Sequence, residues 1–218
     1  MKSPAGMVYM HTRRVGDNVW VHMNDYLPPN IHQFCATWED GKLEKKFQRP
    51  MITLWNVPID DTSTMNLGFR HINEAITQEE QDRINAQKNS LTGEGFGQNG
   101  NRPYEERQRV PGDYDAQVGQ RPIAVHALEH LGTTDRGVVM LRRIVREGVR
   151  AVQKGEDPEF LHREEGRVIS TCSNDTIIRI PKPETDEAEK RLLHETGRKV
   201  AEEIMALSAR PEKSLEHV

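Results

Sequence analysis

Apolar and polar residues alternate along several short stretches in the first third of the chain, the pattern of half-buried β-strands. Residues 18–23 place three apolar side chains on one face and Trp20 and His22 on the other. Residues 51–57 and 64–71 alternate in the same way, and residues 8–13 and 31–38 are further candidate strands. Residues 60–63 predict a turn, because Asp and Ser side chains hydrogen-bond to nearby backbone. We therefore expect four or five antiparallel strands of one curved sheet.

A helical period replaces this alternation after residue 77. Thr77 and Glu80 have the spacing of a capping box, which predicts a short helix over residues 77–87. The further expectations are a helix over 116–131 that contains Pro122, a short strand pair within 168–180 and an amphipathic helix over 186–209. Residues 89–102 are rich in Gly, Asn and Ser, so they predict a loop that is either a lid or a surface excursion. Strands followed by helices indicate an α+β fold.

One predicted helix begins beside a carboxylate. Gly132 ends the preceding segment, Thr133 or Thr134 can cap the next, and Asp135 in the first turn suits the positive end of a helix. Asp135 therefore has two interpretations. It is an ordinary first-turn acid, or it is a metal ligand beside the apolar side of the helix.

The same helix has a regular apolar stripe, with arginines largely between its members. The stripe consists of Val138, Leu141, Val145, Val149 and Val152. This spacing predicts one buried face. We expect the helix to run to about Lys154, because Gly155 is a typical terminator.

Several stretches resemble the catalytic domain of Rieske non-heme iron oxygenases, near the phthalate dioxygenase and 5,5'-dehydrodivanillate O-demethylase types. They are residues 56–62, 101–117, 129–137 and 168–176. The likeness extends over nearly the whole chain. It implies a helix-grip (START/Bet v 1-like) fold, truncated at its N-terminal side, in which a long C-terminal helix lies across the antiparallel sheet and encloses an apolar pocket. The Asp135 helix suits that role. We expect a partial catalytic domain over 1–180 and a peripheral helical extension over 181–218.

The resemblance also implies a mononuclear Fe(II) site of two histidines and one carboxylate, which leaves positions open for O2 and substrate. Asp135 matches the carboxylate. The family's His-x4-His motif has no counterpart among the nine histidines. His126 and His130, four residues apart on the expected helix, are either a separate metal pair or a surface histidine pair. The family's [2Fe-2S] Rieske cluster needs Cys-x-His and Cys-x-x-His pairs, which Cys35 and Cys172 do not form, so this chain is not expected to bind it.

Candidate contacts to a small aromatic substrate are Trp55, Asn66, His71 and Arg107. Trp55 belongs to a set of apolar strand positions that are either pocket lining or ordinary core. The other members of that set are Met51, Met65, Leu67 and Phe69. Asn66 and His71 suit a polar substituent or a scaffold role. Arg107, with Arg102 and Arg109, offers bidentate pairing to a substrate carboxylate.

Composition and charge narrow the possible partners. The formal net charge of −4 disfavours a nucleic-acid surface. No apolar stretch approaches the about 18 residues of a membrane span. Residues 1–7 lack the pattern of a signal peptide, and two cysteines without a spacing motif fit a reducing cytoplasm.

Two classes of function follow from these observations. The first is part of an oxygenase subunit that hydroxylates or O-demethylates an aromatic compound and is inactive as this chain alone. Its implied partners are a ferredoxin and a reductase, and the family resemblance implies a homotrimer when the subunit is full length. The second is a non-catalytic helix-grip module that binds an apolar ligand or a partner subunit. A structural remnant, with the face of Val138 buried against another subunit, is a third possibility.

Overall fold

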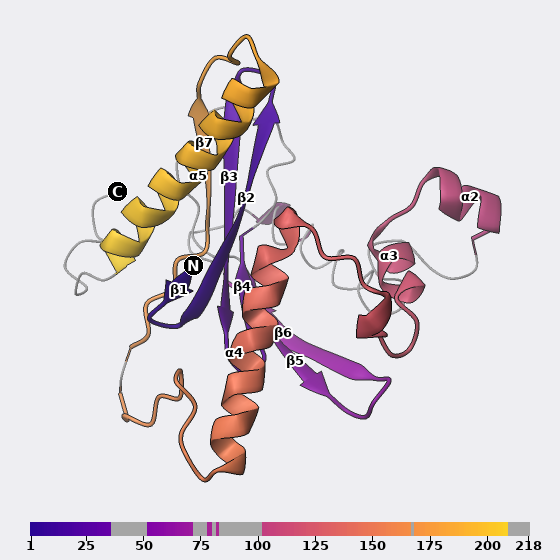
Figure 1. The fold of residues 1–218 in the computed structure, drawn as a ribbon, viewed down its shortest axis with the longest axis vertical. Helices are drawn as coiled ribbons and strands as arrows, with labels where there is room; N and C mark the ends of the chain where they lie inside the picture. Colours follow the sequence, from indigo (N-terminus) through magenta and orange to yellow (C-terminus); the bar gives the residue numbers. More distant parts are fainter. Residues whose placement is uncertain (36–51, 72–77, 80–81, 83–101, 167, 209–218) are drawn as a thin grey trace. The chain divides into compact units, whose positions relative to one another are not determined.

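The computed structural model describes residues 1–35, 52–71, 78–79, 82, 102–166 and 168–208 (Figure 1). The chain divides into two compact units, and each is described by itself. The first unit comprises Met1–Val57, Met65–His71 and Leu131–Val218, and the second comprises Pro58–Thr64 and Ile72–His130.

A seven-stranded sheet, counted over the described residues, dominates the first unit. Its strands are β1 (Lys2–Ser3), β2 (Gly6–Val15), β3 (Asn18–Leu27), β4 (Ile31–Phe34), β5 (Ile52–Pro58), β6 (Thr64–Arg70) and β7 (Asn174–Arg179). The order is β1-β2-β3-β4-β5-β6, and β7 pairs with β3 outside this path. All the pairings with a defined register are antiparallel. The five predicted strand stretches are therefore confirmed as far as they are described.

The helices are α2 (Tyr104–Arg109), α3 (Asp113–Gly119), α4 (Arg136–Gln153) and α5 (Asp186–Ser208), with 3₁₀ turns η2 (His126–Leu128) and η3 (Thr133–Asp135). The helices follow β1 to β6 along the chain, and β7 lies between α4 and α5. Helices and an antiparallel sheet in separate stretches of the chain confirm the α+β class. The predicted end of the Asp135 helix is confirmed, since α4 ends at Gln153 and Gly155 has a φ of 76°. At the predicted turn, Asp60 Oδ1 accepts a hydrogen bond of 2.8 Å from the backbone N–H of Thr62.

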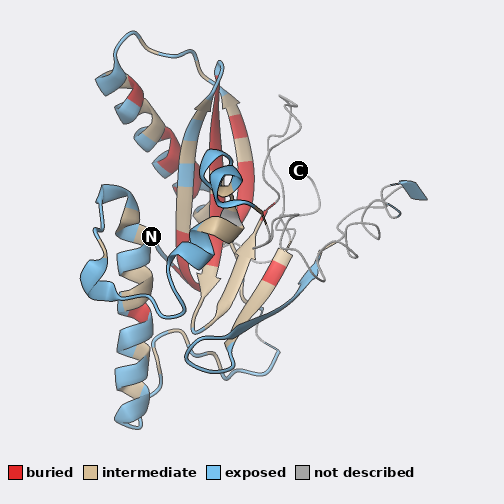
Figure 2. Ribbon diagram, turned by 90° about the vertical axis from the view of Figure 1, so that its right-hand side faces the viewer, coloured by how far each residue is buried: buried red, intermediate tan, exposed pale blue. Residues whose placement is uncertain are grey.

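Helix α5 covers one face of the sheet and supplies part of the core. Val200 and Ala201 pack with buried side chains of β2 and β3, namely Val8, Val19, Val21 and Met23, and with Cys172. Figure 2 shows the buried residues of α5 along one side of the helix and the central strands largely buried. We expected this helix to belong to a peripheral extension, and the family resemblance implied that the Asp135 helix covers the sheet. In the structure α5 packs against the sheet core.

Helix α4 is far more exposed than its apolar period predicts. Val149 is 52% and Val152 is 63% exposed, Val138 and Val145 are exposed as well, and Ile144 is the buried residue of this helix (Figure 2). The prediction of a buried stripe was therefore wrong within this chain. Periodicity shows that a helix has an apolar face, but it does not show whether that face is covered.

Two further expectations are corrected by the structure. The helix predicted over 116–131 is limited to the end of α3 and the short turn η2, with residues 120–125 outside helical structure, because Pro122 lacks the N–H that a helix interior needs. The strand pair predicted within 168–180 is the single strand β7, which pairs with β3. The predicted helix over 77–87 lies mostly outside the described residues, although residues 78, 79 and 82 are helical.

Candidate functional site

Asp135 lies at the junction between η3 and α4. The backbone N–H of Gly132 donates a hydrogen bond of 2.7 Å to Asp135 Oδ2, so the carboxylate closes a capping turn just before the helix starts. Thr133 and Thr134 lie inside this turn and do not cap α4 as expected. The side chain is half-buried. The sequence-based position of this carboxylate at the helix start is confirmed, whereas its role as a metal ligand stays a prediction.

The start of α4 packs against β2. A Cβ added at Gly137 would lie 3.6 Å from the Cβ of Tyr9, which is ordinary van der Waals distance. Gly137 follows Asp135 by two residues. The Asp135 end of α4 is therefore adjacent to the sheet face that carries Tyr9, the face opposite the apolar core under α5.

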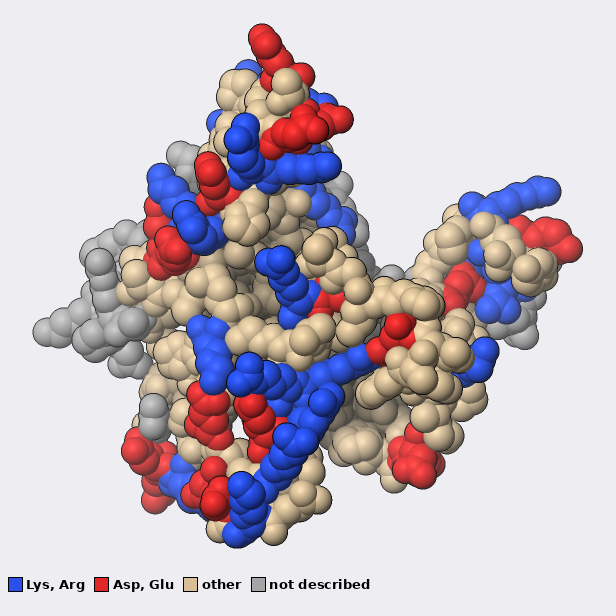
Figure 3. All heavy atoms as spheres, in the orientation of Figure 1, with Lys and Arg blue, Asp and Glu red and all other residues tan. Residues whose placement is uncertain are grey.

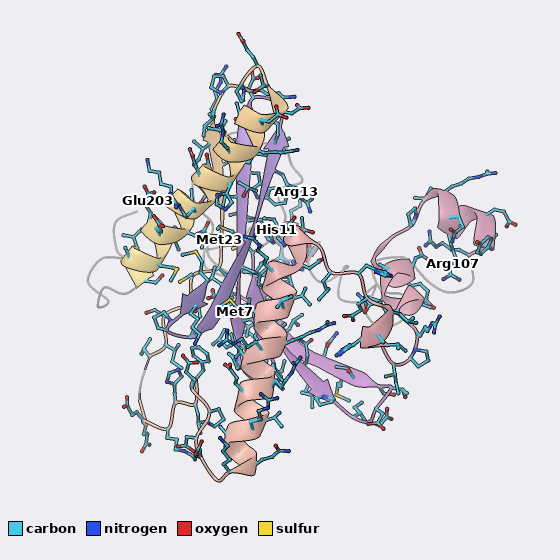
Figure 4. The ribbon with its side chains drawn as sticks, viewed as in Figure 1. Met7, His11, Arg13, Met23, Arg107 and Glu203 are labelled. Carbon is cyan, nitrogen blue, oxygen red and sulfur yellow. The ribbon has the colours of Figure 1, made fainter. Side chains whose placement is uncertain are left out.

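We call this side of the sheet the polar face. Its members are Tyr9, His11, Arg13, Trp20, His22, Asn24, His32 and Asp175. The register pairs Tyr9 with Asn24 and His11 with His22 across β2 and β3, and it pairs His22 with Asp175 across β3 and β7. In Figure 4, His11 and Arg13 extend from β2, while Met23 lies toward α5.

Tyr9 and His32 form a hydrogen-bonded pair on this face. Burial and the nearby charge of Asp25 raise the pKa of Tyr9 to about 12, so the phenol keeps its proton at neutral pH. Burial, together with His22, lowers the pKa of His32 and favours its neutral form. Tyr9 therefore donates its O–H to Nε2 of His32, and the ring proton of His32 resides on Nδ1.

His22 and Asp175 form a second pair, through Nδ1 and Oδ1. Trp20 donates its indole N–H to the same carboxylate oxygen at 3.3 Å. Asp175 is fully buried, and its Oδ2 has no hydrogen-bond partner in the described structure. His11 lies across from His22 with a ring-centroid distance of 6.2 Å, and burial, followed by His22 and Arg13, lowers the pKa of His11.

The described part of the chain does not form a complete iron site. No group of three or more His, Cys, Asp or Glu side chains in it is arranged to hold a metal ion. Asp135 therefore supplies a single carboxylate. His126 lies in η2 and His130 lies outside helical structure, both exposed, so the helical geometry that suggested a separate metal pair is absent. Cys35 and Cys172 are buried and form no disulfide in the described structure.

Trp55 and His71 belong to a cluster on the side of the sheet opposite the polar face, as the register of β3, β4 and β5 shows. Phe69 lies between them, with its ring centroid 5.6 Å from Trp55 and 4.9 Å from His71, and Nε2 of His71 is 2.7 Å from the hydroxyl oxygen of Thr53. Asn66 is exposed on β6. The cluster is therefore not on the side of the sheet that Tyr9 presents to the start of α4.

The apolar residues of β6 are not ordinary core. Met65, Leu67 and Phe69 are 47%, 51% and 52% exposed. The core interpretation of these residues was therefore wrong for this chain. Met51 and most of the predicted loop over 89–102 lie outside the described residues.

Arg107 belongs to the second unit, where an aspartate already engages it. Its Nε donates a hydrogen bond of 2.7 Å to Asp115 Oδ1, and Arg102 donates to Asp115 Oδ2. The N–H of Gly112 also donates to Oδ2, at 3.1 Å. The hydrogen bond from Arg107 is the main reason that the pKa of Asp115 is lowered. A substrate carboxylate would have to compete with this internal partner.

Sequence reasoning missed the polar face as a unit. The available signal was the second set of alternating positions, since Tyr9, His11 and Arg13 occupy one side of β2 as Trp20 and His22 do on β3. Asp175 carried no such signal. Asp175 lies beside His22 because β7 pairs with β3, and these two strands are far apart in the sequence.

Comparisons with known proteins relate the chain to oxygenase subunits. No protein-family model matches it. It is 33% identical to the tert-butanol monooxygenase / tert-amyl alcohol desaturase oxygenase subunit of Aquincola tertiaricarbonis over 205 residues, which are 93% of this chain and 42% of that protein. It is 40% identical to the phenoxybenzoate dioxygenase subunit alpha of Ectopseudomonas oleovorans over 65 residues, 30% of this chain and 16% of that protein. The chain thus spans less than half the length of the relatives it matches.

Among the helices that the structure describes, none is both long and apolar enough to cross a membrane. Helix α4 contains five arginines, and Lys and Arg side chains gather along it in Figure 3.

Proposed function

We propose that this chain is part of a Rieske-type oxygenase subunit that hydroxylates or O-demethylates an aromatic compound with O2, and that Asp135 supplies the carboxylate of its mononuclear Fe(II) site. The observation that carries this proposal is the position of Asp135. Its carboxylate is fixed at the start of α4, two residues before Gly137, which packs against Tyr9 of the polar face. The similarity to two oxygenase subunits supports the same assignment.

The local geometry suits a ligand that must not move. The bond from Gly132 holds Oδ2 and restricts rotation of the side chain, as partners of ligating carboxylates do in metal sites. Asp135 occupies the N-cap position of α4, a place where acidic residues are favoured because the helix dipole is positive there. A single carboxylate does not bind iron strongly. The two histidine ligands and the [2Fe-2S] cluster are therefore assigned to polypeptide beyond this chain.

The arrangement of helices on the sheet is compatible with a helix-grip domain. Helix α5 closes one side of the antiparallel sheet, and the start of α4 contacts the other side at Tyr9. We assign the substrate to the polar face, because the start of α4 packs against that face at Tyr9. Trp55, Asn66, His71 and Arg107 remain predictions for additional substrate contacts.

The proposed partners follow from the reaction class. Oxygenation of this kind consumes two electrons from outside the subunit, so a ferredoxin or a reductase has to deliver them. A cytoplasmic homotrimer is the assembly that the family resemblance implies. These assignments concern the whole oxygenase.

Isotope labelling during turnover by the assembled oxygenase tests the proposal. A methoxybenzene probe should release formaldehyde if the enzyme O-demethylates, and an unsubstituted aromatic probe should gain an oxygen atom from ¹⁸O2 if it hydroxylates. The Asp135→Ala variant should lose either reaction, whereas Asp157→Ala, which changes an exposed ion pair with Arg163, should retain it. Retention of activity by Asp135→Ala would refute the assignment of Asp135 as the iron carboxylate. Binding of the probes without any oxygen incorporation would favour the non-catalytic binding module.

A further inference from the structure

Resting on the proposed function, we infer that His22 hydrogen-bonds a hydroxyl group of the substrate, and that Asp175 is the positioning residue that presents its ring. The site is the centre of the polar face. His22 lies on β3, between Asp175 on β7 and His11 on β2. The substrate class is thus narrowed to phenols and related alcohols.

Asp175 determines which nitrogen of His22 is available. A buried carboxylate accepts the Nδ1 proton, and the indole N–H of Trp20 fixes the same carboxylate oxygen at 3.3 Å. This contact with a carboxylate selects the tautomer with its proton on Nδ1, in which Nε2 carries a lone pair. The His22 side chain is 13% exposed and that of Asp175 only 1%, so the imidazole is accessible and its anchor is not.

The hydrogen-bonding capacity around His22 favours a donor ligand. Tyr9 already occupies Nε2 of His32. The side-chain oxygens Asn24 Oδ1 and Asp175 Oδ2 are buried and have no hydrogen-bond partner in the described structure. The polar face therefore already holds acceptors without a donor beside the partly exposed ring of His22. A hydroxyl group can donate to Nε2 of that ring, whereas a carboxylate only accepts.

The surroundings of His22 also fit an aromatic ring. The imidazole of His11 lies across from it, 6.2 Å between centroids and 25° from parallel, and the ring of Trp20 is 5.4 Å away. Aromatic rings at such distances stack favourably. Arg13 is the cation of this region, and its guanidinium lies over Trp20, 5.8 Å from the ring. Arg13 could instead bind the carboxylate of a ligand, which is the alternative to a hydrogen bond between a hydroxyl group and His22.

Histidine-selective NMR of the 218-residue chain tests this inference. With ¹⁵N-labelled histidines, His22 should show a protonated Nδ1 and a bare Nε2. Phenol should shift the Nε2 resonance of His22, and toluene, which has a methyl group of similar size, should not. His22→Phe should weaken phenol binding by about fivefold, the effect of one hydrogen bond, and leave toluene binding unchanged.

Asp175→Asn and Asp175→Glu test the positioning role. In Asp175→Asn the amide nitrogen can donate a hydrogen bond to Nδ1 of His22, so this variant should populate the His22 tautomer with its proton on Nε2. In Asp175→Glu the carboxylate should again select the tautomer with its proton on Nδ1. Because Asp175 is buried, the asparagine variant can fail to fold. The wild-type tautomer decides in that case: a proton on Nε2 would overturn the inference.

The remaining outcomes decide between ligand classes. A shift of His22 by phenol alone supports the inference. A shift by benzoate that is lost in Arg13→Gln, without a phenol effect, would replace it with carboxylate binding, and the absence of any effect at His22 would refute it. These titrations need no iron. A failure of the Asp135 proposal would appear in iron binding and turnover, and not in these titrations, so the two proposals can be tested separately.

Discussion

Gly197 of α5 lies directly against Thr12 of β2. A Cβ added at Gly197 would be 2.6 Å from the hydroxyl oxygen of Thr12 and 3.5 Å from the sulfur of Met10. Real Cβ atoms essentially never approach other heavy atoms to 2.6 Å. The missing side chain at this position lets the helix reach the sheet, and the contact places Val200 and Ala201 in the core.

Gly197→Ala should therefore destabilise the chain, although alanine favours helices. The β-branched side chain of Thr12 is stiff, so relief needs a shift of the helix, and overpacking of this kind costs about 1–3 kcal/mol. Gly148→Ala is the matched control, because its Cβ would meet only Pro158 at 3.7 Å. The control should gain up to about 1 kcal/mol from helix propensity. Urea unfolding of both variants measures the difference, and equal stabilisation by both would contradict this packing.

Asp25 should make the chain less stable as the pH rises. Its Oδ2 accepts hydrogen bonds from the N–H of Cys172 at 2.6 Å and the hydroxyl of Ser173 at 2.8 Å. Burial nevertheless dominates and raises its pKa above the ordinary value of 3.8. Between that value and the raised pKa, the folded state holds a proton that the unfolded state has released, so the free energy of unfolding falls with increasing pH.

Asp25→Asn removes this titration. The difference in melting temperature between wild type and variant, followed from pH 3.8 upward, should move steadily in favour of the variant until the folded pKa is passed. A difference that does not depend on pH would show that Asp25 ionises normally in the folded state.

Glu189 should have the opposite pH dependence. Arg14 binds it bidentately, at 2.8 Å and 2.9 Å, and this hydrogen bonding lowers the pKa of Glu189 below 4.5. Its stabilising effect is complete above pH 4.5 and is lost as the pH falls through the lowered pKa. Glu189→Gln should therefore melt at a lower temperature than wild type at pH 7, and the two should converge in acid. Parallel melting curves over the whole range would argue against the ion pair.

The exposure of the apolar stripe of α4 predicts that substitutions on this helix differ in their effect on stability. Ile144 is 6% exposed, so Ile144→Ala should cost about 2–4 kcal/mol of unfolding free energy. Val149→Ala should change it by no more than about 0.5 kcal/mol, as is usual for surface positions. Denaturant unfolding distinguishes the two. A large loss for the valine variant would mean that the stripe is buried in solution.

The sequence predicts those features that depend on neighbouring residues. The strands around Trp20 follow from alternation, and the start of α4 beside Asp135 follows from Gly132 and the apolar period. Features that depend on distant segments were not accessible. Helix α5 covers the sheet because it approaches Thr12 closely at Gly197, and the periodicity of apolar residues does not reveal such a contact. The His22–Asp175 pair requires a strand pairing between residues more than 150 positions apart.

Iron binding to the intact oxygenase tests the central claim most directly. The subunit containing this chain would be purified anaerobically from its source cells, with its nitrosyl complex measured by electron paramagnetic resonance. We predict the signal of a mononuclear iron site in the wild type and in the Asp157→Ala control, and a loss of about tenfold or more in Asp135→Ala. An undiminished signal and full iron content in Asp135→Ala would contradict the assignment of Asp135 as the iron carboxylate.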